Sequence, residues 1–236
     1  MSNKNNTKGD CFSCQNLSCL MKKNYDADSY ADVVANRYII DCKKSQSFIM
    51  EGAPVQGIFF VYSGKAKVTR TGANGKEQVI RLAADGDIVG HRGYNRATVY
   101  PIAATALENT TLCYFHHKYF TNEMQTHNTL TYDLMLFYAD ELDKSEARAK
   151  RYAQMNVKDK VIDTLLTIYD RFGQDEKGLR FVLSRTELAN VAGTKSEQLI
   201  RSLTALKNKG WINCEGKYIF IVDAAALRKE IEKFNF

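Results

Sequence analysis

Four cysteines are the residues whose type and spacing best suit a metal centre. Cys11, Cys14 and Cys19 lie within nine residues, in the spacing C-x2-C-x4-C. Cys113 lies much further along the chain, at the end of an apolar run. Thiolates are soft ligands, and a set of four binds either an iron–sulfur cluster or a tetrahedral zinc ion. We therefore predict that these four cysteines share one metal site.

The same cysteines allow other interpretations, which the spacing leaves open. Spacing alone does not separate zinc from iron–sulfur, and a thiol switch needs no metal at all. Cys113 by itself also fits a buried small apolar side chain, which is a common place for a free cysteine. Cys42 and Cys214 lie outside the group, and we interpret both as structural.

The bulk composition is that of an ordinary protein of the cytoplasm. The sequence has 236 residues and a formal net charge of +6, which fits contact with nucleic acid without requiring it. Its first residues are polar and lack the apolar stretch of a secretory signal, and no segment approaches the length of a membrane span. We therefore expect a cytoplasmic protein without a membrane partner. In a reducing cytosol, closely spaced cysteines more often bind metals or do redox chemistry than form disulfides.

The C-terminal part contains a positively charged helix-turn-helix pattern. Ser184 and Glu187 have the spacing of a capping box at the start of one short helix, and Gly193 suits its end. A second helix is predicted to begin near residues 194–196. Residues 180–217 contain seven lysines and arginines against three acidic residues, an excess of four positive charges. Such a module has the charge to lie on DNA phosphates.

The second of these helices presents side chains that can read bases. Glu197 and Arg201 are four residues apart and share one face. Glutamate can accept a hydrogen bond from cytosine N4, and arginine can bind guanine O6 and N7. Two structural interpretations compete, namely a Glu197–Arg201 salt bridge and a capping box of Thr194 and Glu197. The residues predicted to contact DNA are Ser196, Glu197, Gln198, Arg201, Arg185 and Lys195.

Two periodicities describe the elements between the cysteines and the helix-turn-helix. Short apolar runs divided by turn residues occupy residues 48–115, a pattern typical of an all-β sandwich or roll. A heptad stripe then indicates one long helix at about residues 129–154. Such a helix either pairs with a second copy or packs on its own domain. The stripe consists of Met135, Tyr138, Leu142, Ser145, Ala149 and Tyr152.

The chain resembles the Crp/Fnr family, which contains the cyclic-AMP receptor protein and its oxygen-sensing relatives. The resemblance covers nearly the whole chain and rests on Ser63-Gly64, on the Gly-Asp-Ile-Val-Gly stretch at 86–90, on the long helix and on the helix with Glu197 and Arg201. It is closest to the Fnr branch. Residues 106–113 are similar to the stretch that carries that branch's internal cluster cysteine, and Cys113 falls on that cysteine.

This resemblance implies an α+β fold with four parts. These are a cysteine-rich N-terminal segment, a double-stranded β-helix (a jelly roll like that of cyclic-nucleotide-binding domains), a long dimerisation helix and a winged helix-turn-helix. We expect the four parts at residues 1–23, 24–127, 128–155 and 156–236. The implied partners are a second copy of the chain, double-stranded DNA with a two-fold symmetric operator, and RNA polymerase.

For the cysteines, the resemblance implies a [4Fe–4S] cluster on Cys11, Cys14, Cys19 and Cys113, with zinc or no cofactor as the alternatives. The Fnr branch spaces its N-terminal ligands C-x2-C-x5-C, so this chain is one residue shorter. Ile200 replaces a small polar residue, and Lys195 replaces a hydroxyl residue, on the reading helix. The operator preference therefore need not match that of Fnr.

Cyclic-nucleotide binding is not expected of this sequence. In relatives that bind cyclic AMP, a glutamate holds the ribose and an Arg-Ser or Arg-Thr pair holds the phosphate. These places fall here on His91 and on Tyr100-Pro101, and a buried phosphate without arginine would be poorly compensated.

The leading hypothesis is a homodimeric transcription regulator that responds to oxygen, redox state or nitric oxide through the cluster. The alternative is a regulator of the same family gated by a small effector or by a zinc or thiol switch. A catalytic β-roll is a third class. Because no Ser/His/Asp or Cys/His set and no phosphate-binding glycine loop stands out, we predict that the protein is not an enzyme.

Overall fold

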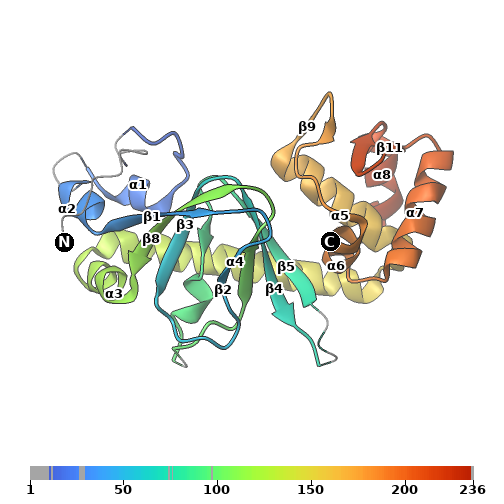
Figure 1. Ribbon diagram of the computed structural model, residues 1–236. Coiled ribbons are helices and arrows are strands. Elements are labelled where there is room, and N and C mark those ends of the chain that lie inside the picture. Colours follow the sequence, from blue (N-terminus) through green and yellow to red (C-terminus); the bar gives the residue numbers. More distant parts are fainter. Residues whose placement is uncertain are drawn as a thin grey trace. The chain divides into compact units, whose positions relative to one another are not determined.

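The computed structural model describes residues 11, 13–26, 30–73, 75, 77–96 and 98–234 (Figure 1). The chain divides into two compact units, Met1–Asp140 and Glu141–Phe236. Residues 1–10 and 12 of the predicted cysteine-rich segment lie outside the described residues. Within the described part of the chain, no helix is both long and apolar enough to cross a membrane.

The first unit is built on a roll of two antiparallel four-stranded sheets, which confirms the predicted jelly roll. One sheet has the strand order β1-β8-β3-β6 and the other β2-β7-β4-β5. The first sheet comprises β1 (Arg37–Cys42), β8 (Thr110–His116), β3 (Gly57–Ser63) and β6 (Ile88–Val89). The second comprises β2 (Ser47–Ile49), β7 (Ala103–Ala106), β4 (Lys65–Thr71) and β5 (Glu77–Ala84). The short 3-10 helix η1 (His91–Gly93) follows β6.

Strands β3 and β8 are buried on both faces, because a core lies on each side of their sheet. Leu112 and Phe59 belong to the core between the two sheets. Cys113, Phe115 and Phe60 belong to a second core, formed with helices on the opposite side. Successive side chains of a strand point to opposite faces. Cys113 therefore faces the helices and not the interior of the roll.

The helices of the first unit cover this outer face of the sheet. They are α1 (Leu20–Asn24), α2 (Tyr30–Ala35), α3 (His117–Thr126) and α4 (Asn128–Gln154). The buried side chains of Met21, Val33, Phe120, Leu130 and Leu134 join these helices to the second core. Helix α4 is the predicted long helix and continues unbroken from the first unit into the second (Figure 1).

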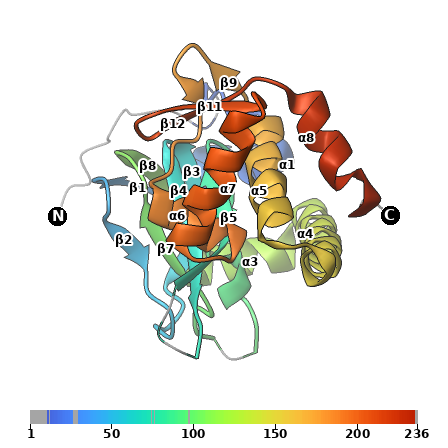
Figure 2. The same cartoon turned by 90° about the vertical axis from the view of Figure 1, so that its right-hand side faces the viewer.

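The second unit is a winged helix-turn-helix, as predicted (Figure 2). Its helices are α5 (Val157–Phe172), α6 (Arg185–Ala192), α7 (Ser196–Asn208) and α8 (Ala224–Ile231). Its strands are β9 (Gln174–Asp175), β10 (Gly178–Leu179), β11 (Ile212–Glu215) and β12 (Tyr218–Ile221). The capping box of Ser184 and Glu187 opens α6, and Gly193 ends it with a φ of 63°. Both local predictions are confirmed.

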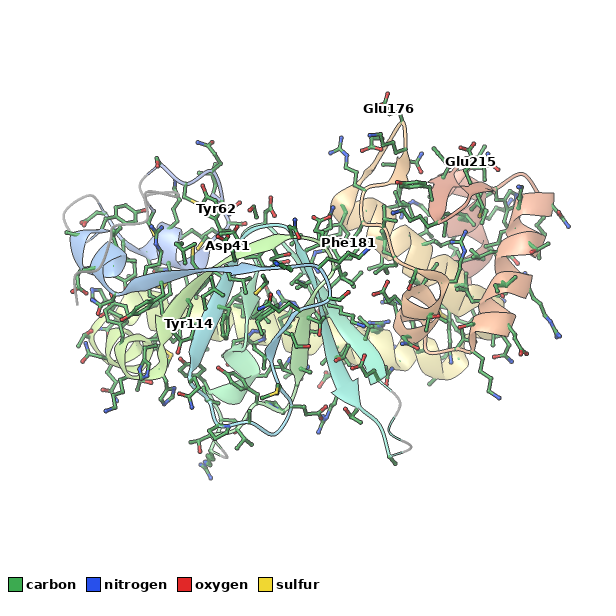
Figure 3. The ribbon with its side chains drawn as sticks, in the orientation of Figure 1. Asp41, Tyr62, Tyr114, Glu176, Phe181 and Glu215 are labelled. Atoms are coloured by element: carbon green, nitrogen blue, oxygen red, sulfur yellow. The ribbon has the colours of Figure 1, made fainter. Side chains whose placement is uncertain are left out.

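Gly57 sets how closely β3 approaches β8. A Cβ atom at this position would lie 2.2 Å from the carbonyl oxygen of Phe115 and 2.4 Å from the ring of Tyr114, which Figure 3 labels. The hydroxyl of Tyr100 also donates to the carbonyl oxygen of Gly57, at 2.6 Å. Only glycine leaves room for these contacts, and the strand that carries Cys113 depends on them.

We expect Gly57→Ala to lower the free energy of unfolding by about 3 kcal/mol, because the clash involves backbone that cannot turn aside. Gly75→Ala is the matched control. Its φ of 70° is strained for alanine, but nothing lies within 4 Å of the added Cβ, so the cost is about 1 kcal/mol. Urea unfolding followed by circular dichroism measures both variants. Equal losses would contradict the role of the close approach.

Candidate functional site

One hollow in the first unit is lined by all four cysteines predicted to bind metal. Cys11, Cys14, Cys19 and Cys113 surround about 370 Å³ of space free of atoms, part of it open to solvent. Its other walls include Asn16, Met21, Lys22, Arg37, Phe60 and Phe115. Cys113 is buried, at 9% exposure, but its side chain opens onto the space that the N-terminal segment borders. The structure thus brings the distant cysteine to the other three.

Local structure explains how each thiol reaches the hollow. Cys11 and Cys14 lie in the loop before α1, and Cys19 is the N-cap residue of that helix. Cys113 lies on the helix-facing side of β8. The side chain of Asn16 donates to the carbonyl oxygen of Tyr62 at 2.7 Å, which holds the loop against the end of β3 (Figure 3).

The cysteine-bearing segment is also tied to the helices behind the sheet. The amide of Asn24 donates to Asp133 on α4 at 3.0 Å, and the hydroxyl of Tyr25 donates to Glu123 on α3. Glu123 is only 4% exposed, so its hydrogen bond is shielded from water. The segment that carries three of the thiols therefore contacts the helix that runs on toward the second unit.

The thiols do not converge on a single point. Among the described residues, no three His, Cys, Asp or Glu side chains are close enough to hold one metal ion. None of the six cysteines, all of which are described, forms a disulfide. The four thiols line one hollow without forming a site for a single ion.

The electrostatics of the hollow favour a bound anion or bound metal over free thiolates. Burial raises the pKa of the Cys113 thiol to about 12, although Arg37 opposes this, and burial raises the pKa of Cys19 to about 11. Both groups stay protonated at neutral pH until a metal replaces the proton. The guanidinium Nη1 of Arg37 donates to Cys11 Sγ at 3.3 Å. Among the described residues that line the hollow, none is acidic.

Two cations at the hollow were not predicted. Lys22 donates through Nζ to the carbonyl oxygen of Cys14, and its position three residues after Cys19 is a signal that the sequence offered. Arg37 is distant along the chain from Cys11, Cys14, Cys19 and Cys113. Only the pairing of β1 with β8 brings it there, and no sequence spacing indicates it.

The place that a cyclic nucleotide would need is filled differently. His91 is 3% exposed and packs edge-on against the rings of Phe137 and Tyr138, at 5.0 and 5.5 Å. The hydroxyl of Tyr100 is engaged with the backbone of Gly57. Neither residue offers a charged partner for a phosphate.

Helix α7 leaves the two predicted base readers exposed and without intramolecular partners. Within the described residues, Glu197 and Arg201 make no ion pair or side-chain hydrogen bond. The competing Glu197–Arg201 salt bridge is therefore absent. The competing capping box is absent too, because α7 starts at Ser196 with Lys195 as its N-cap and no side-chain cap. Thr194 instead donates to Gln198 at 2.9 Å.

The remaining predicted DNA contacts lie around the start of α7 and at α6. Ser196 begins α7, and Lys195 and Gln198 are exposed beside it. Arg185 begins α6 and donates to the carbonyl oxygen of Gly216 at 2.9 Å, so it ties α6 to the turn between β11 and β12. Ile200 is 50% exposed on the same helix as Glu197.

The heptad stripe of α4 is divided between exposed and engaged residues. Met135 and Leu142 are 55% and 60% exposed, and Ser145 and Ala149 are exposed as well. The two tyrosines are held by their own units. Tyr138 donates to the carbonyl oxygen of His91, and the hydroxyl of Tyr152 lies 3.1 Å from that of Thr164. The exposed part of the stripe is therefore its non-aromatic part, Met135, Leu142, Ser145 and Ala149.

Comparisons with known proteins agree with this two-unit architecture. The model of the cyclic nucleotide-binding domain matches residues 39–127, and that of the Crp-like helix-turn-helix domain matches residues 159–230. The transcriptional activator protein anr of Pseudomonas aeruginosa is 26% identical over 205 residues, 86% of this chain and 83% of that protein. The anaerobic regulatory protein of Pasteurella multocida is 24% identical over 188 residues, 78% of this chain and 68% of that protein.

The solved structure of FixK2 from Bradyrhizobium japonicum has the same fold. It superposes with a TM-score of 0.73 at 18% identity, and the match covers 82% of this chain and 96% of that one.

Burial lowers the pKa of His91 to about 3, and the positive charges of Arg81 and Arg92 act in the same direction. A histidine with a lowered folded-state pKa stabilises the fold above its unfolded pKa of about 6.5, and this stabilisation is lost as the pH falls. We expect stability to decrease by about 2 kcal/mol between pH 7.5 and pH 5 on this account. Urea unfolding at both pH values measures it.

His91→Leu should remove most of this pH dependence, since leucine cannot take up a proton. His116→Asn, at an exposed histidine, is the control and should keep it. If both variants have the pH dependence of the wild type, His91 is not its source.

Proposed function

The chain belongs to the Crp/Fnr family of DNA-binding transcription regulators, and we propose that it responds to oxygen, nitric oxide or redox state through a [4Fe–4S] cluster. One observation carries this proposal, namely that the four cysteines line a single hollow. The name of the anaerobic regulatory protein among its relatives supports the same signal.

The positions of the thiols favour a cluster over a single ion, because no three of them are close enough to hold one ion. A [4Fe–4S] cluster takes one thiolate at each of four separate irons. A structural zinc ion needs its four ligands about 2.0–2.3 Å from one point. Here the thiols surround a space without converging. Cys11, Cys14, Cys19 and Cys113 would hold the cluster, and the cluster would supply a centre that reacts with oxidants.

The residues around the hollow would carry the signal to α4. With the cluster in place, the N-terminal segment is held by four sulfurs and by its hydrogen bonds to Tyr62, Glu123 and Asp133. Without it, the apolar packing of Met21 and these hydrogen bonds remain, and each hydrogen bond contributes about 1 kcal/mol. The segment then holds α4 less firmly, so the equilibrium between arrangements of that helix shifts.

We propose that α4 pairs with α4 of a second copy. Met135 and Leu142 leave aliphatic surface exposed on a helix of 27 residues, and such surface is favourable to bury against an equal partner. A dimer presents two α7 helices, which matches a two-fold symmetric operator. RNA polymerase is a further expected partner on family membership alone.

Each α7 would read one half-site. Glu197 and Arg201 are exposed, share a face and have no ion pair or side-chain hydrogen bond to any described residue. The cytosine N4 amino group and the guanine O6 and N7 atoms match these side chains. Lys195, Ser196 and Gln198 lie close enough in sequence to contact neighbouring phosphates or bases.

Purification under anaerobic conditions tests the cluster. We expect a brown protein with about four irons and four sulfides per chain, as a [4Fe–4S] cluster requires. Cys19→Ser should lose most of this iron, whereas Cys42→Ser should keep it, because Cys42 lies in the core between the sheets. A colourless wild-type protein with one zinc per chain would contradict the proposal. Equal iron content in the two variants would contradict the ligand set.

Binding to a selected operator tests the reading helix. Arg201→Ala should weaken specific binding by about 1–3 kcal/mol and relax the preference at one base position of each half-site. Lys207→Ala, in the last turn of the same helix, is the control and should leave the base preference unchanged. The base preference is measured by selecting bound sequences from random DNA. The number of chains bound to each operator is measured separately. An Arg201→Ala protein that selects the wild-type operator would exclude Arg201 as a reader.

A further inference from the structure

We propose that Arg37 compensates the negative charge of the bound cluster and, through its hydrogen bond to Cys11, raises the cluster's reduction potential. This inference rests on the proposed function, since it concerns the same hollow. It assigns a role to a residue that carries none of the ligand sulfurs.

The strand register directs Arg37 into the hollow. In the β1–β8 pair, Ile39 lies opposite Cys113 and Arg37 lies opposite Phe115. Residues directly opposite in an antiparallel pair share a face, and so do residues two apart along a strand. Arg37 and Cys113 therefore lie on the same, helix-facing side of the sheet. The guanidinium reaches across this side to Cys11 Sγ, at 3.3 Å.

Among the described residues, the charge of Arg37 is not balanced by an acidic partner. Within the described part of the chain, Arg37 forms no ion pair with an Asp or Glu, and no acidic side chain is among those that line the hollow. Its Nε is buried and lacks a hydrogen-bond partner there. A half-buried cation without a counter-charge is costly. A [4Fe–4S] core with four thiolates is an anion and would supply the missing charge.

The same contacts set the direction of the effect on the potential. One-electron reduction makes the cluster more negative, so a nearby positive charge favours the reduced form. A hydrogen bond to a ligand sulfur acts in the same direction, and both are known levers on cluster potentials. The apolar walls formed by Met21, Phe60 and Phe115 limit screening by water, which strengthens the interaction.

Three variants in the full-length protein test this inference. Arg37→Gln removes the charge and keeps a hydrogen-bond donor on a shorter side chain. Arg37→Lys keeps the charge. Arg70→Gln removes an equal charge from an exposed site on β4 and is the matched control. Iron and sulfide per chain are measured first, and the midpoint potential of the loaded cluster is then measured by spectroelectrochemistry.

We expect a more negative midpoint potential in Arg37→Gln, a potential close to that of the wild type in Arg37→Lys, and no change in Arg70→Gln. If Arg37→Gln fails to hold a cluster while Arg37→Lys holds one, the charge is again required. A loaded Arg37→Gln protein with the wild-type potential would overturn the inference. The inference would also be overturned if both Arg37 variants lost the cluster or showed an equal shift of the midpoint potential. Arg37 would then act through its shape and not through its charge.

The iron and sulfide content tests the proposed cluster, and the midpoint potential tests the role of Arg37. A wild-type protein without iron and sulfide refutes both at the first measurement. A wild-type protein with a full cluster, together with a midpoint potential that does not depend on Arg37, refutes the role of Arg37 alone.

Discussion

The alternation of side chains along β8 is the constraint on which the candidate metal site depends. Leu112 packs between the two sheets, and Cys113 therefore faces the helices. A shift of one residue in the strand register would turn the thiol into the interior of the roll, out of reach of the N-terminal segment. The close approach at Gly57 and the burial of Phe60 and Phe115 hold that register. The packing of the roll thus determines where a fourth ligand is available.

The hollow combines buried thiols with the cations Lys22 and Arg37. Both kinds of group are costly to bury alone in their charged form, and both are compatible with a bound anionic centre. The thiols of Cys19 and Cys113 are protonated because burial disfavours their thiolates. Its basic groups, Lys22 and Arg37, have no acidic neighbour among the residues that line it. Thiolates bonded to a metal core would satisfy both conditions, since the core replaces the protons and the cations offset the remaining charge. The proposed cluster would therefore account for both features of the hollow.

The helices outside the roll divide their residues between folding and recognition. Tyr138 and Tyr152 of α4 form hydrogen bonds within their own units, whereas Leu142 remains exposed. On α7, Leu199 is buried, while Glu197 and Arg201 are exposed and have no side-chain partner in the described part of the chain. Polar and apolar groups that folding does not use are the ones that an operator or a second copy can use.

The sequence by itself determined the order of the elements, the capping of α6 by Ser184 and the exposed face of the reading helix, because these follow from periodicity and from neighbours in the chain. It also indicated which cysteines to group. Only the tertiary structure decided that Cys113 opens onto the same space as the other three, that Glu197 and Arg201 do not pair with each other, and that Arg37 lies beside Cys11. Strand pairing and burial bring distant residues together or hold near ones apart, and local spacing carries no information about either.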